Sequence, residues 1–136
     1  MTQGKLFPRT TVGGVDLPRM LMGTNWLLGW SHTSAAADRA IKEKYARPED
    51  FYPVFEAYLQ YGIDAIMAPA STNPIMVDAI RYAEDRSGKK ITIIDTPAMN
   101  VDDSPEARAE AREVIRHSRE IGAAFCLIHH TSVEQL

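Results

Sequence analysis

One uncharged apolar run constrains the fold of this chain more than any other feature. Residues 123–128 carry no charge and do not alternate with polar residues, and the run ends in the adjacent histidines His129 and His130. An apolar run of this kind predicts a strand that is buried on both faces of a parallel sheet. Polar residues placed where such a strand ends are typical of the sites of parallel α/β proteins. The run therefore indicates a fold class and the edge of the sheet at which chemistry would take place.

Further apolar segments along the chain also end in polar residues. We expect these strands at residues 20–22, 63–70 and 90–95. The first two are followed by Gly23-Thr24-Asn25 and Ser71-Thr72-Asn73, and the third closes with Asp95-Thr96. Helical spacing of apolar residues, together with capping residues, predicts helices over residues 35–45, 48–61, 74–87 and 105–121. Strands that alternate with helices in this way imply a parallel sheet with right-handed crossovers.

The amino-terminal region adds a hairpin to this pattern. The β-prone segments 9–12 and 15–17 flank a Gly13-Gly14 pair, which is a hairpin signal. Two architectures then fit the order of elements: a flavodoxin-like open sheet, and half of a TIM (β/α)8 barrel with one extra helix after its first strand. The half-barrel is favoured because the hairpin can plug the bottom of a barrel and because polar residues end every strand. The sequence also stops where a fourth helix would begin, as expected for half of an eight-fold unit.

The composition describes an ordinary globular chain. Its 136 residues predict a single domain, residues 1–136, with 45% apolar and 24% charged residues. A net charge of −3 provides no basic excess for nucleic acid or an anionic membrane, so we expect neither as a partner. The single cysteine, Cys126, rules out a disulfide within the chain, and we expect it to be a buried structural thiol in a cytoplasmic protein. No run approaches the length of a signal peptide core or a membrane span.

Two segments resemble the aldo-keto reductase barrel. Met20-Leu21-Met22-Gly23-Thr24-Asn25-Trp26 follows a hairpin, as the strand ending in Gly-Thr does in that family, and Leu127-Ile128-His129-His130 is similar to its fourth strand. The family has Asp and Tyr after the second strand and Lys at the end of the third. This chain has Ser71-Thr72 and Asp95-Thr96 at those places, so only His129 carries over from the catalytic tetrad. The resemblance implies barrel ancestry, shared with the amino-terminal halves of aldolase-type and metal-dependent barrels, and it does not imply reductase activity.

Asp95, His129 and His130 are the candidate catalytic residues. The two histidines are adjacent on a strand, so their side chains should point to opposite faces and at most one should face a barrel interior. Neutral imidazole is a general base near neutral pH and a common ligand of transition metals. Asp95 should lie at the same level of the neighbouring strand, where it would orient the histidine or share a divalent metal ion with His129. The alternative is that Asp95 caps the loop after its strand while a histidine binds backbone atoms.

The candidate substrate-binding residues follow the first two strands. Asn25, Trp26, Ser71 and Thr72 would line a polar pocket at the carboxyl edge, whereas Asn73, which precedes a proline, reads as a plain helix cap. The sequence therefore predicts a TIM-barrel enzyme module acting on a small carbonyl or hydroxyl substrate, by metal-assisted or acid/base chemistry. The alternative is a non-catalytic half-barrel that associates with itself. In either case two exposed sheet edges predict a homodimer that closes an eight-stranded barrel.

Overall fold

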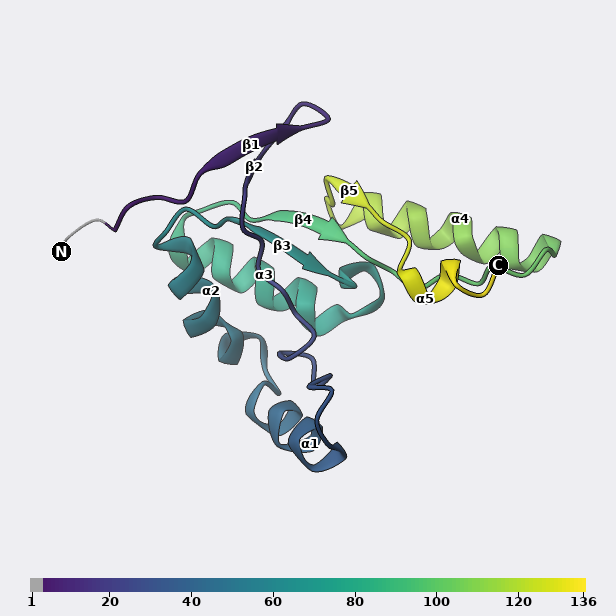
Figure 1. The fold of residues 1–136 in the computed structure, drawn as a ribbon, viewed down its shortest axis with the longest axis horizontal. Helices are drawn as coiled ribbons and strands as arrows, with labels where there is room; N and C mark the ends of the chain where they lie inside the picture. Colours follow the sequence, from purple (N-terminus) through teal and green to yellow (C-terminus); the bar gives the residue numbers. More distant parts are fainter. Residues whose placement is uncertain (1–3) are drawn as a thin grey trace.

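The computed structural model describes residues 4–136 and shows a mixed α/β chain with two sheets (Figure 1). The hairpin consists of β1 (Arg9–Val12) and β2 (Val15–Pro18) and is antiparallel, and the parallel sheet consists of β3 (Ala65–Ala68), β4 (Thr92–Asp95) and β5 (Phe125–Cys126). The predicted hairpin is confirmed at both strands. Its turn uses Gly13 and Gly14 at positive φ angles of 55° and 80°, which glycine adopts without a Cβ penalty.

The first predicted parallel strand contributes a single residue to the sheet. Met22 donates its amide to the Ala65 carbonyl over 2.9 Å and accepts the Met67 amide over 3.0 Å, which makes a parallel bridge between Met22 and Ile66. The strand predicted over residues 20–22 is thus reduced to this bridge, and Met20 remains 42% exposed. The order across the sheet is Met22, β3, β4, β5, which is also the order in the chain.

The four predicted helices are confirmed as α1 (Ala35–Lys44), η1 (Pro48–Phe51) continuing into α2 (Tyr52–Leu59), α3 (Pro74–Ser87) and α4 (Pro105–Glu120). Two short helices come in addition, η2 (Ala70–Thr72) and α5 (His130–Val133). Ser34 and Ser104 cap α1 and α4, because each hydroxyl accepts the amide of the residue three positions later over 3.1 Å. Proline at position 53 coincides with the change from the η1 turn to the regular helix α2.

The main core lies between the parallel sheet and the helices. Side chains alternate between the two faces of a strand, and Ile66 and Ile93 point to the helical side. There they join the buried stripes of η1, α2 and α3, namely Phe51, Phe55, Leu59, Met76, Ala79, Ile80 and Ala83. These stripes are the ones that the helical spacing predicted.

The hairpin covers part of the other face of the sheet. Leu17 of β2 packs with Ala65 and Ile94. These two residues lie on the face of the sheet opposite to Ile66 and Ile93, which face the helices. Arg9 stabilises the contact between the hairpin and the sheet, because its guanidinium donates to the Gly62 carbonyl over 2.9 Å and to the Asp64 carboxylate over 3.0 Å. Ala65 begins β3, so the hairpin covers the amino-terminal part of this face, and Met67, two residues further along, stays 36% exposed.

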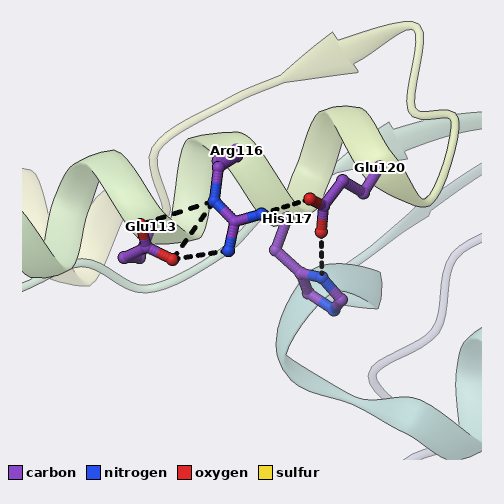
Figure 2. Close-up of polar contacts among 4 residues, drawn as sticks. All are labelled: Glu113, Arg116, His117 and Glu120. Atoms are coloured by element: carbon purple, nitrogen blue, oxygen red, sulfur yellow. Dashed lines mark hydrogen bonds and ion pairs between the residues drawn. The ribbon is translucent and has the colours of Figure 1, made fainter.

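Helix α4 carries a charged surface. Arg116 donates to Glu113 over 2.7 Å and also pairs with Glu120, and His117 lies 3.4 Å from Glu120 (Figure 2). The hydrogen bond from Arg116 lowers the pKa of Glu113. His117 is half exposed.

The fourth predicted strand differs most from expectation. The run 123–128 was predicted to be buried on both faces, but only Phe125 and Cys126 form β5, and Leu127 and Ile128 are 47% and 50% exposed. Cys126 is exposed as well, which corrects the expectation of a buried thiol. The physical reason is that β5 has β4 on one side and no strand on the other within residues 4–136. An apolar run is buried only where neighbouring elements cover it.

Candidate functional site

The carboxyl ends of the parallel strands place the candidate residues at one edge of the sheet. Strand β3 leads through Pro69 into η2, which carries Ser71, and β4 ends at Asp95. Beyond β5 the chain continues alongside β4, since the amides of Leu127 and His129 donate to the carbonyls of Asp95 and Pro97 over 2.7 and 3.0 Å. Parallel pairing thus brings the loops after all three strands to the same level.

Asp95 is the most unusual polar residue at this edge. Its side chain is fully buried, and its Oδ1 accepts the backbone amide of Ser71 over 3.1 Å. Neither its Oδ2 nor the Ser71 hydroxyl, on a side chain that is also buried, has a hydrogen-bond partner among the described residues. Buried polar atoms without partners are rare because each costs its desolvation free energy. Asp95 Oδ2 and the Ser71 hydroxyl are thus two polar groups that lie in the interior, closed to solvent, on residues that are joined by a hydrogen bond.

Thr72 and Asn73 have local roles. The Thr72 hydroxyl donates to the Pro69 carbonyl over 3.2 Å and is exposed, so it closes the η2 turn. Asn73 occupies the N-cap position of α3 as predicted, but its side chain makes no capping hydrogen bond. Of the residues predicted after β3, only Ser71 is thus joined to Asp95.

The two histidines lie against each other. Their ring centroids are 4.3 Å apart with the planes tilted by 38°, whereas a continued strand would have pointed them to opposite faces. The strand has ended by this point, and His130 is the first residue of α5. His129 is the N-cap of that helix, because its Nδ1 accepts the amide of Thr131 over 3.3 Å and lies 2.7 Å from the Thr131 hydroxyl.

The expected pairing of Asp95 with a histidine stays a prediction. Asp95 binds the Ser71 amide and His129 binds Thr131, and within residues 4–136 no hydrogen bond joins the carboxylate to either imidazole. The same residues contain no cluster of three or more His, Cys, Asp or Glu side chains that could hold a metal ion. A metal on Asp95 and His129 would therefore need its remaining ligands from outside these residues or from water.

The residues after the first parallel segment are more open. Asn25 and Trp26 are exposed, Trp26 by 56%, in the turn that precedes α1. Thr24, just before them, is buried and donates its hydroxyl to the Met67 carbonyl over 3.0 Å, which ties this turn to the end of β3. The sequence gives no signal for this contact, because it joins residues that are 43 positions apart.

A shallow pocket that the sequence did not predict lies beside this turn. Its volume is about 290 Å³, and it is lined by Leu27, Leu28, Lys42, Tyr45, Ala46, Phe51, Asn73 and Ile75. The lining comes from the turn before α1, from α1, from η1 and from the start of α3. Four separate segments meet there, so no local motif marks the pocket. Its polar groups are few, the Lys42 ammonium and the Asn73 amide among them, over a mostly apolar floor.

Comparison with family models, with curated proteins and with solved structures gives no match for this chain. The geometry of its own residues therefore carries the functional argument. Among residues 4–136, no helix combines the length and the apolar character needed to cross a bilayer.

Proposed function

We propose that this chain is a half-barrel of the (β/α)8 type and an enzyme module for acid/base chemistry on a small carbonyl or hydroxyl substrate. The order of the parallel sheet supports the half-barrel, since Met22, β3, β4 and β5 follow one another in the sheet as in the chain. A barrel has this sequential order, whereas a flavodoxin-like open sheet reverses direction at a switch point.

The distribution of covering elements supports the same architecture. The stripes of α2 and α3 pack on one face of the sheet, while the hairpin packs on the amino-terminal part of the other face. An open doubly wound sheet has helices on both faces, but a barrel has them only outside. The hairpin is then a plug at the bottom of the barrel, and the opposite, carboxyl edge is where barrel enzymes place their chemistry.

The single observation that carries the catalytic part is the buried pair formed by Asp95 and Ser71. Its unpartnered carboxyl oxygen and hydroxyl are placed at the carboxyl edge, and such costly groups persist mainly where function retains them. Alternation along β4 places Asp95 on the helical side of the sheet with Ile93, under η2, so the proposed reaction requires η2 to move aside. Asp95 then moves a proton to or from the substrate, Ser71 positions a substrate oxygen, and His129 or His130 serves as a second acid or base. In the metal-assisted form, Asp95 and His129 would be ligands, and the remaining ligands would come from water or from outside the described residues.

A second candidate function is a non-catalytic half-barrel whose role is self-association. The observation that favours it is the pairing of both Asp95 and His129 with nearby loop groups, as a purely structural role requires. The two candidates differ in whether Asp95 acts on a substrate, so a single substitution separates them.

The test is proton exchange at the carbon next to a carbonyl, which needs no knowledge of the natural substrate. Wild-type chain is incubated in D₂O with dihydroxyacetone, glyceraldehyde, glycolaldehyde or pyruvate, and loss of the α-proton signal is followed by NMR. We expect the wild-type chain to exchange the α-proton of at least one compound faster than buffer alone. Asp95→Asn should lower that rate by roughly 100-fold or more, as for loss of a general acid or base.

The matched control is Asp78→Asn, the same carboxyl-to-amide change at an exposed position of α3. This variant should exchange protons at the wild-type rate, and circular dichroism should show that both variants are folded. If the wild type is no faster than Asp95→Asn with all four compounds, the catalytic proposal is wrong and the structural role remains.

A further inference from the structure

The exposed surface of this chain is larger than that of an average compact monomer of its size. The accessible surface is 8680 Å², whereas a folded chain of 15.2 kDa exposes about 7,100 Å². The excess of roughly 1,500 Å² includes the exposed amino-terminal segment, and it is large enough to contain the ~800 Å² that each partner buries in a standard interface.

Part of that surface is the face of the sheet that the hairpin leaves open. Met67 lies on the same face as Ala65, beyond the reach of Leu17, and is 36% exposed. Leu127 lies on the face of Phe125, two residues further along, and is 47% exposed. These side chains would point into the interior of a closed barrel, which is normally filled from all its strands.

Both edges of the sheet also have unused hydrogen-bonding groups. The amides of Leu127 and His129 bind β4, so the alternate residues Cys126 and Ile128 direct their backbone groups to the other side of β5. At the opposite edge Met22 uses its amide and carbonyl toward β3, so Leu21 and Gly23 direct theirs outward. No further strand pairs with either edge within residues 4–136.

We propose that a second copy of this chain covers the open face and pairs both edges, so that two half-barrels close one eight-stranded barrel. Around a two-fold axis, the segment 126–128 of each copy runs parallel to the segment 21–23 of the other, and the two seams are identical. The excess surface of roughly 1,500 Å² per chain is large enough to supply the area that a stable dimer buries. This inference rests on the half-barrel in the proposed function, but it does not depend on catalysis.

The closure also affects the candidate site. In a closed barrel the carboxyl edges of both copies form one ring, so the Asp95 edge of one chain would face the loops of the other across the barrel mouth. Exposed polar residues of each copy, including Asn25 and His130, would then lie at the same barrel mouth as those of the other copy. Only two half-barrels together would surround a substrate.

Sedimentation equilibrium between about 1 and 100 μM tests the association. We expect the wild-type chain to have twice its 15.2 kDa mass. Leu127→Lys should raise the dissociation constant by roughly tenfold or more, because it would bury an unpaired ammonium inside the barrel. The matched control is Tyr61→Lys, a change at a 46% exposed residue in the turn between α2 and β3, and this variant should remain dimeric.

The melting temperature of the wild type provides a readout that does not depend on any variant, because that of a dimer rises with protein concentration. A folded monomer over this whole range, with a melting temperature independent of concentration, would overturn the proposal and leave the open face to a different partner. Equal association of Leu127→Lys and Tyr61→Lys, or open-ended oligomers in place of a dimer, would also overturn it. A dimer without proton-exchange activity would contradict the catalytic proposal but not the dimer. An active monomer would contradict the dimer but not the catalytic proposal.

Discussion

The carboxylate of Asp38, in the first turn of α1, accepts two hydrogen bonds from Ser31. The amide of Ser31 donates over 2.8 Å and its hydroxyl over 2.7 Å, both to Oδ1. The side-chain hydrogen bond, followed by that from the backbone, lowers the pKa of Asp38. Helical spacing alone would favour Lys42, four residues further along α1, as the partner of Asp38. Ser31 is closer in space because the turn before α1 folds back onto the helix.

This lowered pKa makes a prediction about acid stability. A carboxylate with a lowered folded-state pKa stabilises the folded chain above its unfolded pKa and stops doing so as the pH falls through the folded value. Asp38→Asn should therefore be less stable than wild type at neutral pH, and the difference should shrink as the pH falls below the ordinary aspartate pKa of about 3.9 and through the lower folded-state value. Urea unfolding at several pH values measures it. Glu43→Gln, at an exposed position of the same helix, should show no such dependence, and a pH-independent difference for Asp38→Asn would contradict the assignment.

At the scale of the element, the caps of α3 and α4 differ in a way that can be measured. Ser104 caps α4 with its hydroxyl, but Asn73, at the same position of α3, makes no side-chain capping bond. Ser104→Ala should lower the free energy of unfolding by about 1 kcal/mol, and Asn73→Ala by only a few tenths. Urea unfolding curves of both variants provide the comparison. Equal losses would show that the Asn73 side chain caps α3 in solution.

The helices could be predicted from the sequence because their signals are local. Stripes such as Met76, Ala79, Ile80 and Ala83 need only helical spacing, and the caps lie within three residues of the groups that they bind. The state of β5 was not predictable in this way, because burial of an apolar run depends on strands that are distant in the sequence. The candidate site shows the same limit. The position of Asp95 at a strand end was expected, but its bond to the Ser71 amide, 24 residues away, was not.

At the scale of the whole molecule, the parallel sheet is supported unequally across its width. Strand β3 has hydrogen-bonded neighbours on both sides, Met22 and β4, and its side chains reach both cores. Among residues 4–136, strand β5 has β4 as its single neighbour, and two backbone hydrogen bonds hold the exposed run that follows it. The sheet therefore has a firmly held centre and a weakly held last strand.

This difference has a consequence for how the molecule opens over time. Backbone amides exchange with solvent through the smallest opening that frees them, so the free energies of exchange should fall from β3 toward β5. In dilute solution the amides of Ile66 and Met67 should exchange only when the whole chain unfolds. Those of Leu127 and His129 should exchange through detachment of the last strand, many times faster. Hydrogen exchange followed by NMR measures both, and equal rates would mean that the chain opens as one cooperative unit. At concentrations where two copies associate, exchange at Leu127 should slow toward the rate of β3, because the last strand then acquires a second neighbour.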